Sequence, residues 1–411
     1  MWKRDASLSP GDRRLDEERL LNGSPRWQPA LPSERYRALD ILRGLALFGV
    51  LIVNLLTLFR VPLLEHILTP HTDPGGANRL VDILVAGALE FKAVTIFSFL
   101  FGAGVAIQAD RATSRHVRAP LFLVRRMSWL FLLGVAHLFL VWNGDILTLY
   151  AICGVLILPF LSLPSPVLGV VGLAAVVLPT FVRWGLPLDL AADVPARIAR
   201  AREVYGNGGF LPILRFRWQE SWALIVPLLA GILPRTAGVM CWGAAAWRSG
   251  ILRDPDRYRG TLITVVALVA PLAITLTVNQ VWATETGYAP WALLANTSDA
   301  PSILLALAYV SAFLLWRRPR RAGTFRGLAA LGQMALTNYL IQSVALGFIF
   351  YGYGFGLFGQ LGSASAACIG IALYAAQTQV SRVWLNRFRF GPFEWLWRFL
   401  SYGQRQLLRR E

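Results

Sequence analysis

Long apolar segments recur along this chain, and they constrain its fold more than any other feature. A helix needs about 20 mostly apolar residues to cross the hydrocarbon core of a bilayer. Apolar residues make up 55% of the 411 positions and charged residues only 15%, outside the range of ordinary soluble proteins. The sequence therefore predicts an all-α, polytopic membrane protein. Ten membrane-spanning helices are expected, at 38–59, 86–108, 122–142, 145–162, 166–184, 220–246, 260–281, 301–316, 328–350 and 360–381.

Arginine-rich segments alternate with segments poor in positive charge, and this pattern predicts the orientation. The positive-inside rule places arginine-rich loops in the cytoplasm. With ten spans, both termini are then cytoplasmic. The segment 185–219 lies outside the membrane in this scheme and is expected to form a small helical cap. Residues 1–37 form a polar tail, 38–384 the membrane domain and 385–411 a basic C-terminal region.

The net charge of +17 would indicate a nucleic-acid partner in a soluble protein. Here the positive charges cluster in alternate loops, so they are interpreted as facing the anionic lipid of the bilayer, and no nucleic acid is expected. The three cysteines and four histidines show no spacing typical of metal ligands, so no metal site is predicted.

The first span carries polar residues within its apolar run. Asp40 and Arg43 lie near its start and Asn54 near its end. An intramembrane charge costs at least about 2.5 kcal/mol and therefore indicates a specific role. Eleven residues are about three helical turns, so Arg43 and Asn54 share one face. Either Asp40 and Arg43 anchor the helix end to lipid phosphates, or this face lines a polar cavity.

Further polar residues lie within or beside the third and fourth spans. His137 lies on the same face as Arg126, eleven residues earlier, and is either a functional histidine or one bonded to a neighbouring carbonyl. Asp145 follows a tight turn and is a candidate helix cap as well as a site residue. Tyr150 lies five residues deeper in the fourth span.

Later spans and one loop add a second group of candidates. Arg235 follows Pro234 in the sixth span, and broken helices beside charges often line cavities. Asn338 and Gln342 form a polar stripe that either binds a ligand or bonds to another helix. The loop after the first span contains His66 and His71.

The C-terminal region differs from the spans because it mixes aromatic and charged residues. Gly391 and Pro392 predict a helix start. Glu394 and Arg398 have the spacing of an exposed pair, and tryptophan beside arginine is typical of the headgroup layer. We predict an interfacial helix that anchors the chain or contacts a cytosolic ligand.

Several sequence blocks together resemble the YeiB-like family of bacterial inner-membrane proteins, a family of unknown function. The blocks are LDILRGLALFGVLIVNL at 39–55, FSFLFGAGVAIQADR at 97–111, GDILTLYAICGVLIL at 144–158, LGQMALTNYLIQS at 331–343 and RFRFGPFEWLWRFLSYG at 387–403. The resemblance spans most of the chain. It implies a multi-pass protein of the bacterial cytoplasmic membrane.

The opening helix is also similar to that of the transmembrane acyltransferase superfamily, which begins with an LDxxRG-like motif. This resemblance implies transfer of an acetyl group from cytoplasmic acetyl-CoA to an acceptor. In the O-acetyltransferase branch an arginine precedes a catalytic histidine by eleven residues. Arg43 matches the arginine, but Asn54 takes the second position and cannot act as a base near neutral pH. The glucosamine branch has asparagine there and its histidine in the next loop, where this chain has His66 and His71.

The leading hypothesis is an acyltransferase-like enzyme with an acyl-CoA donor and a lipid or glycan acceptor. Arginine suits phosphate recognition. The alternatives are a small-molecule permease and a non-catalytic membrane protein. The candidate donor-binding residues are Asp40, Arg43, Arg126 and Arg235; the candidate catalytic residues are Asn54, His66, His71 and His137; and the candidate substrate-binding residues are Asp145, Tyr150, Asn338 and Gln342.

Overall fold

The fold was analysed in a computed structural model, which describes residues 36–68, 75–114, 119–181, 193–286, 299–316, 325–404 and 406–409. Within these ranges the regular structure is helical, apart from one isolated bridge between Phe388 and Arg409. The predicted all-α class is therefore confirmed for the described residues. The N-terminal tail and His71 lie outside them.

The helices follow one another with short connections. In the first half they are α2 (Arg37–Asn54), η2 (Leu55–Phe59), α3 (Leu63–Leu68), α4 (Gly76–Ala88), α5 (Lys92–Ser114), α6 (Ala119–Ala136), η3 (His137–Val141), α7 (Leu147–Leu156), η4 (Leu158–Ser162), α8 (Ser165–Val177) and η5 (Leu178–Phe181). In the second half they are α10 (Val194–Asn207), α11 (Phe210–Glu220), η6 (Ser221–Ile225), α12 (Val226–Arg248), α13 (Arg259–Thr264), η7 (Val265–Val269), α14 (Ala270–Thr286), α16 (Asp299–Trp316), α17 (Arg326–Gln333), α18 (Ala335–Phe350), α19 (Ser363–Arg387) and α20 (Pro392–Tyr402).

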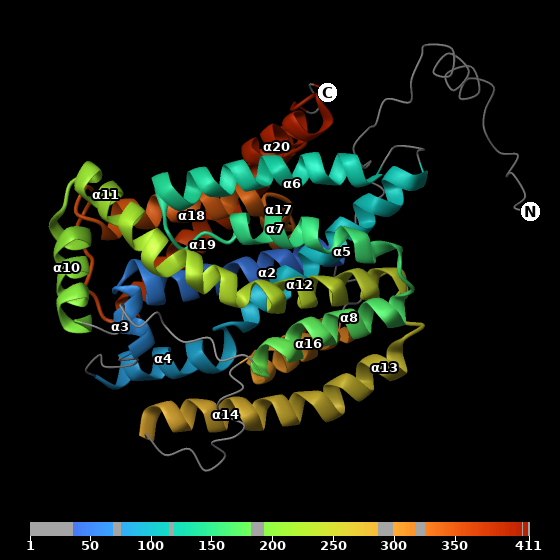
Figure 1. Ribbon diagram of the computed structural model, residues 1–411, viewed down its shortest axis with the longest axis horizontal. Helices are drawn as coiled ribbons and strands as arrows, with labels where there is room; N and C mark the ends of the chain where they lie inside the picture. The colour runs from blue at the N-terminus through green and yellow to red at the C-terminus, as the bar shows by residue number, and fades with distance from the viewer. Residues whose placement is uncertain are drawn as a thin grey trace, which may run out of the picture.

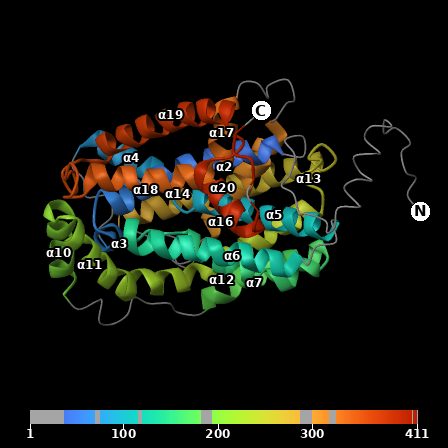
Figure 2. The ribbon, with the colours of Figure 1, turned by 90° about the horizontal axis from the view of Figure 1, so that it is seen from above.

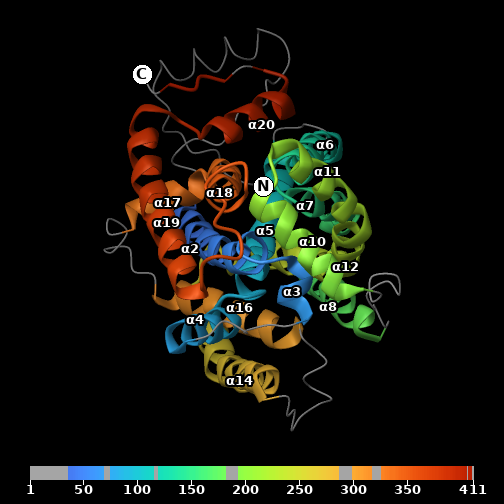
Figure 3. The same cartoon turned by 90° about the vertical axis from the view of Figure 1, so that its left-hand side faces the viewer.

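The long helices lie roughly parallel to one another and to the longest axis of the molecule (Figure 1). At one end α10 lies across the bundle beside α3 and α11 (Figure 1). The opposite end carries Arg111, Arg248 and Arg253, and we call it the arginine-rich end. Seen from above, α19 and α12 lie on opposite sides of the bundle (Figure 2). In the end view, α20 crosses one side of the bundle and α14 lies on the other (Figure 3).

Five helices are long and apolar enough to cross a membrane, and a bent pair raises the number to six. The five are Arg37–Phe59, Gly76–Ser114, Ala119–Val141, Phe210–Arg248 and Arg259–Ala283. The bent pair is α17 and α18, which meet at 83°. Three further apolar helices are shorter: Leu147–Leu156, Ser165–Val177 and Ala300–Trp316. The described residues thus support a polytopic membrane protein, but with fewer full-length spans than the ten predicted.

Glycines allow the central helices to approach one another closely. A methyl group on Gly44 or Gly332 would overlap a backbone oxygen of the other helix where α2 packs on α17. The same holds for Gly102 and Gly243, where α5 packs on α12. Small residues stabilise membrane helices in this way because they allow extended van der Waals contact. The packing fixes α2 and α5 at the centre of the bundle.

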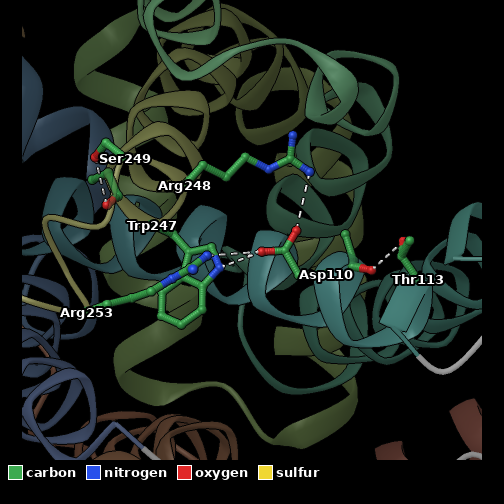
Figure 4. Close-up of polar contacts among 8 residues, drawn as sticks. Asp110, Thr113, Trp247, Arg248, Ser249 and Arg253 are labelled. Atoms are coloured by element: carbon green, nitrogen blue, oxygen red, sulfur yellow. Dashed lines mark hydrogen bonds and ion pairs between the residues drawn. The ribbon is translucent and has the colours of Figure 1, made fainter. Parts of the chain in front are cut away.

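A half-buried carboxylate, Asp110, ties α5 to α12 at the arginine-rich end (Figure 4). Asp110 accepts a hydrogen bond from Trp247 Nε1 at 2.9 Å and from the guanidinium groups of Arg248 and Arg253 at 3.4 and 3.3 Å. The Arg253 guanidinium lies over the Trp247 ring, 4.3 Å from its centroid. Trp247 in turn packs edge-on against Tyr36, at the start of α2. This cluster fixes the end of α12 against the beginning of the first span.

Candidate functional site

A cavity of about 280 Å³ lies among α2, α5, α6, α7, the α17–α18 pair and α20. Its walls are mostly apolar, and its polar side chains come from helices far apart in the sequence. The polar and aromatic lining residues are Tyr36, Asp40, Arg43, Phe97, Phe101, Gln108, Arg111, Arg126, Tyr150, Gln333, Tyr339, Phe390, Glu394, Trp397, Arg398 and Tyr402.

Four arginines and two carboxylates line the cavity, an excess of two positive charges. Arg43 donates to Asp40 Oδ1 at 3.1 Å, so part of its charge is compensated within α2. A Cβ on Gly104 of α5 would lie 3.4 Å from Arg43 Nη2, so the absence of a side chain there leaves room for the guanidinium. Such a set of guanidinium groups suits phosphate or carboxylate ligands, which accept paired hydrogen bonds.

The C-terminal helix α20 forms one wall of the cavity. The Arg126 guanidinium of α6 lies 3.5 Å from the centroid of the Trp397 ring. Trp397 Nε1 donates to the Arg126 carbonyl oxygen at 2.9 Å, and Arg125 donates to the carbonyl oxygen of Ser401. The predicted helix start at Pro392 is confirmed. Besides any contact with lipid, α20 supplies side chains to the cavity.

Glu394 and Arg398 of α20 do not form the exposed pair that their spacing predicts. The Glu394 carboxylate accepts from the backbone N–H of Thr337 at 3.0 Å and also contacts the Thr337 hydroxyl, so it caps the start of α18. Arg398 lies over the Phe390 ring, 4.5 Å from its centroid. Burial raises the pKa of Glu394 and lowers the pKa of Arg398. The pair differs from the prediction because α20 packs against the bundle.

Tyr150 and Tyr339 line the cavity together with Ile146 and Leu147. The Tyr150 hydroxyl is 2.9 Å from Ser98 Oγ and donates to a carbonyl of α5. The Tyr339 hydroxyl donates to the Gly144 carbonyl at 3.2 Å and accepts from the Ile146 N–H at 3.3 Å. Tyr339 thereby joins α18 to the turn before α7.

A buried histidine–carboxylate pair lies beside that turn. His137 Nδ1 is 2.9 Å from Asp145 Oδ1, and neither side chain is exposed. Asp145 Oδ2 accepts from the Thr148 N–H at 2.7 Å, so the predicted cap on α7 is present. The Tyr339 ring centroid is 5.2 Å from that of His137. The sequence singled out each residue of the pair, but seven residues of π-helix and turn lie between them, and only the structure pairs them.

Seven of the sequence candidates within the described residues do not line the cavity, and Asn54, Arg235 and His66 are three of them. Asn54, the last residue of α2, is half-buried and is not among the residues that line the cavity. Arg235 donates to Thr95 Oγ1 at 2.7 Å. His66 lies 3.1 Å from Glu90, near the break between α4 and α5. Among the described residues, no three His, Cys, Asp or Glu side chains form a group that could hold a metal ion.

Asn338 and Gln342 face α19. Asn338 donates to Ser381 Oγ at 3.0 Å, and Gln342 donates to Gln377 Oε1 at 2.8 Å. Gln377 Nε2 returns a hydrogen bond to the Asn338 carbonyl oxygen at 3.0 Å. All of these side chains are buried, so the polar stripe joins two helices and does not reach the cavity.

Among the lining residues that sequence reasoning missed are Arg111, Glu394, Trp397 and Arg398. The second predicted span ends at residue 108, so Arg111 lies outside it, although it belongs to the last turn of α5. The other three lie on a helix interpreted mainly as an anchor. The mixture of tryptophan and charge in α20 was a usable signal, because an anchor alone does not require a buried glutamate.

The chain is similar to known proteins over most of its length. Residues 246–404 match a family model described as a protein of unknown function (DUF418). The chain is 32% identical to the uncharacterized protein YxaH of Bacillus subtilis (strain 168), with 91% of this chain and 96% of that protein covered. It is 30% identical to the uncharacterized protein YeiB of Escherichia coli (strain K12), with 90% and 96% covered. No solved structure matches. The chain belongs to the YeiB-like DUF418 family of proteins.

Proposed function

We propose that this protein is a membrane acyltransferase that binds a phosphate-bearing acyl donor, such as an acyl-CoA, in the arginine-lined cavity. The observation that carries the proposal is the lining itself. Four arginine side chains line one cavity: Arg43, Arg111, Arg126 and Arg398. Most of the other lining residues are apolar or are tyrosines. An amphipathic anion fits this combination, because its phosphates pair with guanidinium groups while its apolar part leaves water.

The size of the cavity limits how such a donor would lie. Ligand pockets typically measure about 300–1,000 Å³, and this cavity, at about 280 Å³, is at the small end. It would hold the diphosphate and the adjoining arm of a CoA thioester, while the nucleotide extends past α20 into solvent. The acyl group would then approach Tyr150 and Tyr339. The acceptor in this proposal is a lipid or glycan hydroxyl.

The proposed orientation places the arginine-rich end in the cytoplasm of a bacterial cell, with both termini on that side. The positive-inside rule supports this assignment, as does the cytoplasmic location of acyl-CoA. A fluorescent protein fused after Glu411 should fold and emit, while alkaline phosphatase at the same position should be inactive. Active phosphatase in that fusion would show that the C-terminus lies outside the cytoplasm. It would then contradict both the proposed orientation and a cytoplasmic donor.

Binding calorimetry with purified protein tests the donor assignment. We expect acetyl-CoA to bind the wild-type protein, and Arg111→Ala and Arg43→Ala to weaken binding about tenfold or more, because a hydrogen bond to a charged group contributes about 1.5–3 kcal/mol. Arg253→Ala is the matched control, since Arg253 lies at the same end of the bundle but stacks on Trp247. No binding by the wild type, or equal losses in all three variants, would contradict the assignment.

One feature favours a permease as the second candidate. The helix break between α17 and α18 borders the cavity, because Gly332, Gln333, Ala335 and Leu336 all line it. Transporters use such discontinuous helices to bind substrates within the membrane. A counterflow assay in proteoliposomes distinguishes the two functions: a permease exchanges labelled organic anion without covalent change, whereas a transferase releases free CoA.

A further inference from the structure

The His137–Asp145 pair is placed where it can act on a ligand in the cavity. Asp145 precedes Ile146 and Leu147, which both line the cavity, so the pair lies directly behind that wall. Tyr339 contacts both regions, because it lines the cavity and its ring packs against the imidazole. The Tyr339 side chain therefore links the hollow to the histidine.

The hydrogen bonds of the pair prepare the imidazole to accept a proton. One Asp145 oxygen faces His137 Nδ1, and the other is held by the Thr148 N–H. A carboxylate in this position fixes the proton on Nδ1 and leaves the lone pair on Nε2. Within the described part of the chain, Nε2 is buried and has no hydrogen-bond partner. A histidine retained only for packing would be expected to have this atom paired, since buried polar atoms usually are.

The local backbone is also unusual. His137 begins the π-helix η3, and its carbonyl oxygen accepts from the Trp142 N–H at 2.8 Å. Such wide turns within α-helices occur frequently at functional sites. The π-turn continues α6 directly into the turn that carries Asp145. It thus brings two residues eight positions apart into contact.

The Tyr339 hydroxyl is bonded to one short turn. It makes hydrogen bonds of 3.2 and 3.3 Å, both longer than usual for a hydroxyl. Both partners, Gly144 and Ile146, belong to the same short turn. Rotation of Tyr339 would open the wall between the cavity and His137 Nε2 without displacing a helix.

We propose that His137 and Asp145 are the proton-accepting pair of the transfer reaction and that Tyr339 separates them from the cavity until the substrates are bound. This inference rests on the proposed function. The acceptor hydroxyl oxygen attacks the carbonyl carbon of the thioester, and its proton passes to His137 Nε2. A C–O bond forms, the C–S bond breaks, and the CoA thiolate takes the proton from the imidazolium. Asp145 keeps the Nδ1 proton in place and stabilises the imidazolium.

The test uses acetyl-CoA with water as the acceptor, and free CoA is measured by chromatography. We expect slow CoA release by the wild-type protein and at least a 100-fold lower rate in His137→Gln, with acetyl-CoA affinity within twofold of wild type. Asp145→Asn should reduce the rate 10- to 100-fold, because the amide can hold the wrong imidazole tautomer. His66→Gln is the matched histidine control, since His66 pairs with Glu90 and does not line the cavity, and it should release CoA at the wild-type rate.

A second variant tests the inference if His137→Gln does not fold. Tyr339→Phe keeps the ring but loses both hydroxyl contacts. The ring should then rotate away more easily, and the rate of CoA release should rise several-fold. An unchanged or lower rate in this variant contradicts the role of Tyr339.

The remaining outcomes distinguish this inference from the proposed function. Wild-type CoA release in His137→Gln overturns the inference, and so does a wild-type protein that binds acetyl-CoA but releases no CoA above the uncatalysed rate. In both cases donor binding stands. A wild-type protein that does not bind acetyl-CoA overturns the donor assignment and this inference with it.

Discussion

The guanidinium of Arg126 is stacked on the indole of Trp397, 3.5 Å from its ring centroid, and the indole Nε1 donates to the Arg126 backbone oxygen. These contacts attach the C-terminal helix to the third span in the chain. The arginine is thereby held at the cavity surface, where its remaining guanidinium edges are available to a ligand. The C-terminal helix is consequently part of the candidate site.

Trp397→Ala should loosen α20 and disturb Arg126. A cation–π contact contributes about 0.5–2 kcal/mol, so we expect a lower melting temperature and roughly tenfold weaker binding of acetyl-CoA. Thermal melting in detergent and calorimetry measure the two effects. Trp395→Ala is the control, because Trp395 lies on the same helix but donates to the Gln406 carbonyl and does not line the cavity. Equal loss of affinity in both variants would show that Trp397 has no specific role.

Glu394 should make anion binding depend on pH. Burial raises the pKa of its carboxyl, so Glu394 stays neutral to higher pH than an exposed glutamate. As the pH rises through this raised value, a negative charge appears beside Arg398 and the affinity for anions falls. A like charge about 8 Å away costs about 2 kcal/mol at an effective dielectric constant of 20, so a change of roughly tenfold or more is expected.

The ligand phosphates also titrate, so the pH dependence is taken from the difference between the wild type and Glu394→Gln. Acetyl-CoA affinity is measured by calorimetry at each pH. The variant should bind with nearly constant affinity where the wild type weakens. Identical pH profiles would mean that ionisation of Glu394 does not change the affinity for the ligand.

Gly332→Ala should separate α17 from α2. The added methyl group would overlap the backbone oxygen of Asp40, whose side chain pairs with Arg43. Overpacking of this kind costs about 1–3 kcal/mol, and we expect lower thermal stability together with weaker donor binding. Gly87→Ala is the control, because nothing lies within 4 Å of a Cβ there. Its stability should be unchanged or higher, since alanine is the better helix former.

Gln342→Leu should affect stability without affecting donor binding. The substitution leaves Gln377 Oε1 without its hydrogen-bond donor between α18 and α19. Interhelical hydrogen bonds in membranes contribute about 0.6–2 kcal/mol, so a modest fall in melting temperature is expected. A large loss of acetyl-CoA affinity at unchanged melting temperature would instead support the substrate-binding role that the sequence suggested.

Hydrophobic periodicity predicted the helical class and several spans closely. The first span was predicted at 38–59 and is found at Arg37–Phe59, and the third was predicted at 122–142 and is found at Ala119–Val141. The ninth was predicted as one helix but bends by 83° at Met334. Neither Pro nor Gly occupies the break itself, so no local sequence signal marks it; the bend accompanies the packing of α17 on α2.

The site was predicted only where one residue is enough to indicate it. A charged residue in an apolar run singled out Arg43, whereas Arg126 and Tyr150 were singled out by their spacing from His137 and Asp145; all three line the cavity. The contacts between distant helices were not predictable, because one sequence does not specify which helix faces join. For this reason His137 and Asp145 were candidates for different roles, and Trp397 was not connected with Arg126.

The most direct test of the central claim is a cryo-electron microscopy structure of the protein saturated with acetyl-CoA. The account predicts density for the diphosphate in the cavity, within hydrogen-bond distance of guanidinium groups among Arg43, Arg111, Arg126 and Arg398, with the thioester directed toward Tyr339. Ligand density outside the cavity, or an empty cavity at a saturating concentration, would contradict it.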